Sequence, residues 1–183
     1  MLKSQTDSAV SIASGNYFTF QEKADRIVES IKDRMVAGRL TASTAESITG
    51  GLVGASLVSV PGASLFYKGG VVAYSNESKM KVLGVKAETL SVHGAVSMET
   101  AVEMAKGARA LFDADIALSC TGIAGPSGQT EHKPVGLVYI AAVTSGKADA
   151  RERRYSGNRT HIRLAVADDM LSLLLEAASA RDV

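Results

Sequence analysis

Two short apolar runs, residues 40–44 and 70–73, each end in polar side chains and lead into a segment with helical spacing. Glu46 and Ser47 follow the first run, and Tyr74 follows the second. An apolar or β-branched run that gives way to apolar residues spaced three and four apart is typical of a strand that turns into a helix. Both runs are therefore predicted to be strands whose ends present polar groups.

The rest of the chain continues this alternation. Helical spacing is present in residues 21–37, 52–60, 76–83 and 160–180, in a short piece from Ala87 and in a long segment after Ser97. Further strands are expected at residues 114–120, 135–144 and 149–156. Early strand–helix alternation favours parallel pairing, whereas the last three strands can pair as hairpins. The order predicts an α/β fold, a three-layer α/β/α single domain with a mixed sheet.

The length and composition limit how this domain is organised. A chain of 183 residues with 46% hydrophobic content can bury one sizeable core. Residues 1–20 are rich in serine and lack sustained periodicity, so they are predicted to be a mobile N-terminal extension. Residues 21–183 are expected to form the domain itself.

The charge balance bears on the class of partner. Twenty basic and 19 acidic residues give a formal net charge of +1, with no basic stripe for nucleic acid and no polybasic patch for an anionic membrane. We therefore expect a small-molecule substrate, with no nucleic acid or membrane as partner.

Cysteine usage and hydropathy indicate the compartment. Cys120 is the single cysteine, which excludes an intramolecular disulfide and a cysteine-based zinc site. No apolar run approaches the roughly 20 residues that a bilayer span needs, and the N-terminus does not resemble a signal peptide. A cytoplasmic protein without a metal or other cofactor is expected.

Ser47 has two interpretations. A serine at a strand-to-helix turn commonly caps the helix. Alternatively it is a nucleophile, with helix-start amides near Thr49 and Gly50 to stabilise an oxyanion, and with Gly50 and Gly51 allowing a substrate close to the backbone. There is no GxSxG motif, and a Ser-His-Asp triad is disfavoured because no partner motif surrounds the three histidines, His93, His132 and His161.

Lys79 is the candidate base for such a serine. If Asn76 caps the helix after Tyr74, Lys79 lies in the first turn, where the helix dipole opposes a cation. That field, together with partial burial, would lower the lysine pKa and make a neutral amine available, as a Ser-Lys hydrolase requires. The alternative is a solvated surface lysine. Tyr74 could relay a proton or simply pack.

A third candidate is the glycine-rich segment of residues 119–136, SCTGIAGPSGQTEHKPVG. Its amides could form an anion nest, although a plain turn between strands is the common explanation. It contains neither a Walker loop nor a GxGxxG fingerprint. Cys120 is expected to be a buried apolar residue rather than a nucleophile.

Six short segments occur in order along the chain: TAESITGG, GGVVAYSNESK, HGAVS, TGIAGPSG, KPVG and YSGNR. In order and spacing they closely resemble the CinA C-terminal domain family, over about residues 21–180. The resemblance implies hydrolysis of the carboxamide of nicotinamide mononucleotide to nicotinic acid mononucleotide and ammonia, as in the PncC-type amidohydrolases of pyridine nucleotide recycling. It also implies an α/β/α fold, no cofactor and a homo-oligomer, a dimer or larger. Many relatives carry an additional N-terminal molybdopterin-binding-like domain.

By position, the resemblance implies three catalytic residues, Ser47, Lys79 and Tyr74. Arg159, at the end of YSGNR, is expected to balance a phosphate. The complete set of expected substrate-binding residues is Glu46, Thr49, Gly50, Gly51, Ser75, Asn76, Thr121, Gly122, Ala124, Gly125 and Arg159. The alternative function is a non-catalytic nucleotide-binding or regulatory domain, of the competence- and damage-inducible kind, that uses the same pocket.

Overall fold

A five-stranded mixed sheet forms the centre of the protein. The computed structural model describes residues 6–180, and their side chains from Tyr17 onward. The strand order is β2-β1-β3-β4-β5; β1 is parallel to β2 and β3, and the remaining pairs are antiparallel. The strands are β1 (Ala42–Glu46), β2 (Tyr67–Val72), β3 (Ile116–Gly122), β4 (Leu137–Val143) and β5 (Ala148–Arg154).

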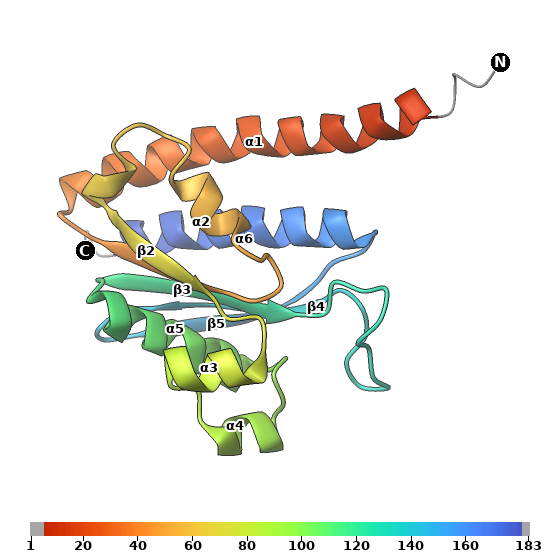
Figure 1. Ribbon diagram of the computed structural model, residues 1–183. Coiled ribbons are helices and arrows are strands. Elements are labelled where there is room, and N and C mark those ends of the chain that lie inside the picture. Colours follow the sequence, from red (N-terminus) through yellow and green to blue (C-terminus); the bar gives the residue numbers. More distant parts are fainter. Residues whose placement is uncertain (1–5, 181–183) are drawn as a thin grey trace.

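Helices cover both faces of this sheet (Figure 1). One face is covered by α2 (Leu52–Leu57) and α6 (Arg159–Ser179), with α1 (Thr6–Ala37) packed over them and the short 3-10 helix η1 (Ala63–Leu65) close to α1. On the other face α5 (Met98–Phe112) lies against the sheet, and α3 (Asn76–Leu83) and α4 (Ala87–Val92) pack against α5. The three-layer α/β/α fold with a mixed sheet is therefore confirmed. Within residues 6–180, none of the helices is both long and apolar enough to cross a membrane.

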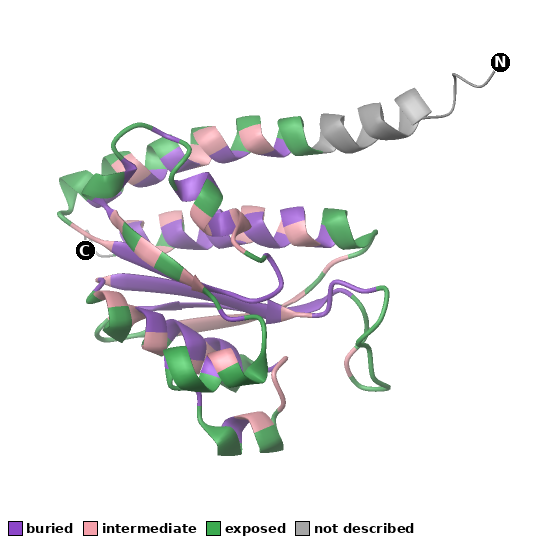
Figure 2. Ribbon diagram, in the orientation of Figure 1, coloured by how far each residue is buried: buried purple, intermediate pink, exposed green. Residues whose placement is uncertain are grey.

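Burial is greatest along the central strands (Figure 2). Six of the seven residues of β3 are buried, from Ile116 to Thr121. A strand covered by helices on both faces reads as a continuous apolar run because neither face meets water. The largest cluster of buried residues lies between the sheet, α6 and α1.

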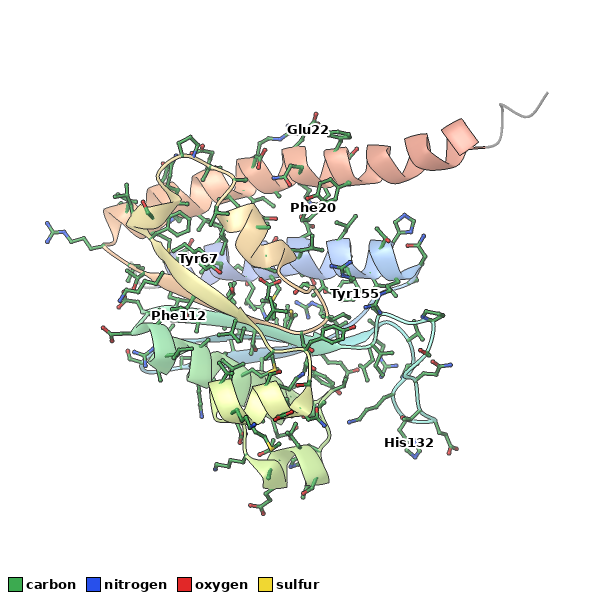
Figure 3. The ribbon with its side chains drawn as sticks, in the orientation of Figure 1. Phe20, Glu22, Tyr67, Phe112, His132 and Tyr155 are labelled. Atoms are coloured by element: carbon green, nitrogen blue, oxygen red, sulfur yellow. The ribbon has the colours of Figure 1, made fainter. Side chains whose placement is uncertain are left out.

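The first helix is longer than predicted. It was expected over residues 21–37 but begins at Thr6, so it includes much of the segment assigned to a mobile extension. Phe20, from that segment, is 8% exposed and belongs to the main core, and its ring points from α1 toward α6 (Figure 3). Packing of an amphipathic face, here with a buried aromatic ring, adds helical stability that local periodicity does not reveal. Residues 1–5 lie outside the described part of the chain.

The cap of α3 also differs from the prediction by one residue. Ser75, not Asn76, is the N-cap: its Oγ accepts a hydrogen bond from the amide of Ser78 at 3.0 Å. Ser78 Oγ in turn accepts from the amide of Ser75 at 3.1 Å. This reciprocal pair is a capping box, which satisfies two helix-start donors at once.

The topology brings three strand ends to one edge of the sheet. Because β1 pairs in parallel with β2 on one side and with β3 on the other, the carboxyl ends of all three strands lie together. In open α/β sheets, ligands bind outside the carboxyl ends of strands where the connections diverge to opposite sides. The polar clusters predicted from sequence follow β1 and β2, so they lie at this edge.

Candidate active site

Ser47 and Lys79 meet at the carboxyl edge of the sheet. Ser47 directly follows β1, and Lys79 lies one turn into α3, the helix that follows β2. The Nζ of Lys79 donates to Ser47 Oγ at 3.1 Å and to the carbonyl oxygen of Ala73 at 2.8 Å. Lys79 is 2% exposed and Ser47 is 8% exposed. The expectation that Lys79 lies in the first turn is confirmed, and the alternative of a solvated lysine is wrong.

Burial lowers the pKa of Lys79 below its ordinary value of 10.5, and the negative charge of a Cys120 thiolate would oppose this effect only in part. Among residues 6–180, no carboxylate forms an ion pair with this amine. The helix dipole at the start of α3 also disfavours a cation. A neutral amine has two donors and one lone pair, which suits the Ala73 carbonyl as acceptor and the Ser47 hydroxyl as donor. The pair is thus arranged for proton transfer from serine to lysine.

A cavity of about 180 Å³ opens onto this pair. We call it the Ser47 pocket; its lining residues are Ser47, Ile48, Tyr74, Asn76, Lys79, Ala95, Val96, Thr121, Gly122, Ala124 and Arg159. Eight of these were predicted as site residues. They come from the ends of β1, β2 and β3 and from the first turns of α3 and α6, segments that lie far apart in the sequence.

Sequence reasoning missed three residues of the pocket wall, namely Ile48, Ala95 and Val96. The side-chain hydroxyl of Thr121 donates to the carbonyl oxygen of Ala95 at 2.6 Å and so ties the segment before α5 to the end of β3. The HGAVS motif that contains Ala95 and Val96 was a usable signal. The small apolar side chains of Ala95 and Val96 carry no chemical signal of a pocket by themselves.

Six expected substrate-binding residues do not line the Ser47 pocket: Glu46, Thr49, Gly50, Gly51, Ser75 and Gly125. Glu46 is the last residue of β1 and is 2% exposed; Thr49 is fully buried. Thr49 donates its hydroxyl to Glu46 Oε2 at 2.6 Å. These two side chains interact with each other under the loop instead of facing the pocket.

The expected source of the oxyanion donors is also wrong in part. The expected donors were helix-start amides near Thr49 and Gly50, but amides that follow directly along the chain, those of Gly51, Val53 and Gly54, all donate to the Glu46 carboxylate, at 2.9, 3.1 and 2.8 Å. The N-cap of α2 is Gly51, so Ser47 does not cap this helix. Within the described chain, the amides of Ile48 and Gly50 have no hydrogen-bond partner, and Ile48 lines the pocket.

Arg159 crosses the mouth of the pocket. Its Nη1 donates to the carbonyl oxygen of Gly125 at 3.1 Å, and its Nη2 donates to the hydroxyl of Tyr74 at 2.9 Å. Both side chains are exposed. No hydrogen bond joins the Tyr74 hydroxyl to Ser47 or Lys79 in the described structure. Tyr74 and Arg159 thus form the rim between β2 and the glycine-rich segment.

The remaining candidate groups take no part in the pocket. Cys120 is fully buried in the core, as predicted, and burial together with the charge of Glu46 raises the pKa of its thiol to about 11. The three histidines are exposed, and none lines the pocket; His132 lies on the outlying loop between β3 and β4 (Figure 3). Across residues 6–180, no group of three or more His, Cys, Asp or Glu side chains could hold a metal ion.

The fold and the pocket define a class: an α/β/α domain with a buried Ser-Lys pair at the carboxyl edge of its parallel strands. Residues 24–178 match the family model of the CinA C-terminal domain. The chain therefore belongs to the CinA C-terminal domain family.

Curated relatives and a solved structure agree with this assignment. A CinA-like protein of Endomicrobium trichonymphae is 52% identical over 145 residues, which cover 76% of this chain and 34% of that protein. A CinA-like protein of Shewanella sp. (strain ANA-3) is 47% identical over 174 residues, covering 92% of this chain and 41% of the relative. The chain thus spans only about a third to two fifths of the length of these relatives.

The crystal structure of a competence/damage inducible protein from Agrobacterium tumefaciens superposes with a TM-score of 0.82 at 40% identity. The alignment covers 84% of this chain and 94% of that one.

Proposed function

We propose that this chain hydrolyses the carboxamide of nicotinamide mononucleotide to nicotinic acid mononucleotide and ammonia, with Ser47 as nucleophile and Lys79 as general base. One observation carries the proposal: a buried lysine without a carboxylate partner lies 3.1 Å from a serine hydroxyl at the wall of a pocket. Binding alone gives no reason to bury an unpaired amine against a hydroxyl, because the burial costs free energy. The choice of substrate rests on the motifs shared with the family.

Acylation begins when neutral Lys79 takes the proton of the Ser47 hydroxyl as Oγ attacks the carboxamide carbon. The carbonyl oxygen becomes an oxyanion in the resulting tetrahedral intermediate. The unpartnered amide of Ile48 is our candidate donor to that oxygen, since the first-turn amides of α2 are held by Glu46. Lys79 then returns its proton to the leaving nitrogen, ammonia departs, and an ester to Ser47 remains.

Deacylation repeats the same proton path with water as the nucleophile. Lys79 removes a proton from the water as the water oxygen attacks the ester carbon, and it returns that proton to Ser47 Oγ as the ester bond breaks. The carbonyl of Ala73 holds the amine in place throughout, because its hydrogen bond does not use the lone pair. The products are the free serine and a carboxylic acid.

The size of the pocket favours a ligand that is only partly enclosed. At about 180 Å³ it is smaller than the roughly 300–1,000 Å³ of pockets that bury a drug-sized ligand. We propose that the pyridine carboxamide enters the Ser47 pocket and that the phosphate stays at the rim, near Arg159 and the glycine-rich loop. Arg159 now donates to neutral oxygens of Tyr74 and Gly125, and a phosphate is a stronger acceptor for a guanidinium.

The test is ammonia release from nicotinamide mononucleotide by the purified protein, with the folded Ser47→Ala variant as control. Release by the wild type and none by the variant would support the proposal. Tight binding of the nucleotide without turnover would instead favour the alternative, a nucleotide-binding regulatory domain.

A further inference from the structure

Glu46 is a buried carboxylate that the mechanism above does not use. Its two oxygens accept four hydrogen bonds: the hydroxyl of Thr49 and the amides of Gly51 and Val53 reach Oε2, and the amide of Gly54 reaches Oε1. The distances lie between 2.6 and 3.1 Å. All four donors belong to the segment that follows Ser47, so the Glu46 carboxylate binds most of the turn between β1 and α2.

Glu46 and Ser47 are neighbours, yet their side chains act on opposite faces of the sheet. Successive side chains of an extended chain point to opposite sides. The carboxylate of Glu46 is bonded to α2, which covers one face, and the hydroxyl of Ser47 is bonded to Lys79 of α3, which lies on the side of the other face. Glu46 therefore cannot touch a substrate in the Ser47 pocket.

The segment of residues 47–51, which we call the Ser47 loop, has no regular secondary structure of its own. Gly50 and Gly51 both have left-handed backbone angles, φ 64° and φ 98°, that other residues rarely adopt. Two further hydrogen bonds hold the Ser47 loop in place. The amide of Ser47 donates to the carbonyl oxygen of Cys120 at 3.1 Å, and Arg163 Nη2 donates to the carbonyl oxygen of Thr49 at 2.7 Å.

We propose that Glu46 is a positioning residue for the reaction: its carboxylate, assisted by Arg163 on α6, holds the Ser47 loop so that the serine hydroxyl meets the lysine amine. The inference rests on the proposed Ser-Lys chemistry. An ionised carboxylate accepts all four donors, whereas the amide of a glutamine would turn its NH2 toward some of them. A misplacement of about 1 Å at reacting atoms can cost about a hundredfold in rate.

The decisive variant is Glu46→Gln, which keeps the shape and removes the charge. We expect its kcat with nicotinamide mononucleotide to fall by about a hundredfold while KM changes less than about threefold, because the defect lies in the alignment of Ser47 and not in binding. Asp169→Asn is the matched control. Asp169 accepts hydrogen bonds from Arg153 at 3.0 Å and Tyr155 at 2.7 Å away from the pocket, so this variant should retain kcat.

A second readout does not depend on the identity of the substrate. The rate at which a fluorophosphonate labels Ser47, followed by mass spectrometry of the intact protein, reports the activated serine directly. Glu46→Gln should slow labelling in parallel with kcat, and Asp169→Asn should not. Wild-type labelling and kcat in a folded Glu46→Gln protein would overturn the positioning role.

Three further outcomes distinguish a failure of the positioning role from a failure of the proposed function. If Glu46→Gln does not fold, Thr49→Val decides: it removes one of the four donors and should slow labelling by about tenfold, and a wild-type rate would overturn the proposal. If the wild type labels at Ser47 but does not hydrolyse the nucleotide, the choice of substrate fails and the positioning role is still tested. If the wild type does neither, the Ser-Lys function itself fails, and the role of Glu46 with it.

Discussion

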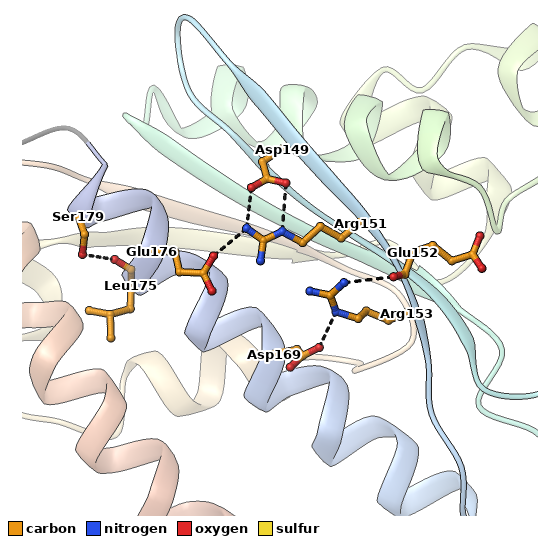
Figure 4. Close-up of polar contacts among 8 residues, drawn as sticks. All are labelled: Asp149, Arg151, Glu152, Arg153, Asp169, Leu175, Glu176 and Ser179. Atoms are coloured by element: carbon orange, nitrogen blue, oxygen red, sulfur yellow. Dashed lines mark hydrogen bonds and ion pairs between the residues drawn. The ribbon is translucent and has the colours of Figure 1, made fainter. Parts of the chain in front are cut away.

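The arginines of β5 and Lys79 of α3 have opposite surroundings. On β5, one of the two edge strands, Arg151 Nη2 lies 2.7 Å from both Asp149 Oδ2 and Glu176 Oε2, and Arg153 Nε lies 3.0 Å from Asp169 Oδ2 (Figure 4). On α3, Lys79 is almost fully buried, and in the described chain it has only a hydroxyl and a carbonyl as partners.

The pKa shifts follow from this difference. The hydrogen bonds to carboxylates raise the pKa of Arg151, and the guanidinium of Arg151 lowers the pKa of Asp149. Burial lowers the pKa of Lys79 instead. Paired charges fasten an edge strand to α6 and stay ionised, whereas an unpaired buried amine can change its protonation state. Perturbed groups of the second kind are typical of functional sites.

The largest expected effect concerns the serine beside the unpaired amine. Ser47→Ala should lower kcat by about ten-thousandfold or more, because it removes the covalent route. The thermal transition should stay close to that of the wild type, since the alanine removes a single hydroxyl. The measurement is ammonia release by protein whose circular dichroism is unchanged. Activity within threefold of wild type would contradict the assignment of Ser47.

The second largest effect is expected for substitutions of Lys79. Lys79→Arg keeps a cation on α3 but cannot supply a neutral amine, so kcat should fall by about a thousandfold. Lys79→Met should be equally inactive and should raise the free energy of unfolding by about 1 kcal/mol, because it removes a desolvated amine. Urea titrations of both variants give the stabilities. Normal turnover by the arginine variant would assign the base to another group.

The rim of the pocket is expected to contribute less than the pair. Nicotinamide riboside should be hydrolysed with a kcat/KM about a hundredfold lower than that of the mononucleotide, because it lacks the phosphate that Arg159 is proposed to bind. Arg159→Ala should reduce this ratio chiefly by slowing the mononucleotide. A wild type that barely distinguishes the two substrates, or a variant that keeps the full ratio, would refute the phosphate contact.

The pH dependence tests the protonation state of Lys79. In the proposed mechanism the active form is the neutral amine, so kcat/KM should rise by about tenfold per pH unit up to the lowered pKa of Lys79 and level off below the ordinary value of 10.5. Between the lowered pKa and 10.5 the unfolded chain binds more protons than the native one, so the free energy of unfolding should also rise with pH. Lys79→Met should lose this rise. A rate that increases only above pH 10.5 would contradict a depressed pKa.

The smallest effect lies on β5. Arg151→Met should lower the free energy of unfolding by no more than about 1 kcal/mol, because the ion pairs of Figure 4 are partly exposed and screened by water. Arg151 lowers the pKa of Asp149. The contribution of Asp149 to the free energy of unfolding is therefore present at neutral pH and is lost as the pH falls through that lowered pKa. Urea titrations at neutral and acidic pH measure the difference. A loss of activity above threefold would show that the two regions are coupled.

Much of the fold followed from periodicity. The strands expected at residues 114–120 and 135–144 and the helices expected at residues 76–83 and after Ser97 are all present, with shifts of a few residues at the strand ends. The start of α1 did not, and Phe20 of the predicted extension packs against the core, a contact that local spacing does not reveal. Glu46 was placed in a polar break but belongs to β1, where it pairs with Val72 and Cys120.

The candidate site divides in the same way. The sequence by itself determined that a serine and a lysine each follow a strand of a parallel pair, which brings both to one edge of the sheet. The tertiary structure decided that Lys79 is buried without a carboxylate, and that Glu46 occupies the first-turn amides of α2. The local spacing of apolar and polar residues predicts which helix or strand a residue belongs to. The partners of a buried polar group come from segments far apart in the chain, and only the packing of those segments selects them.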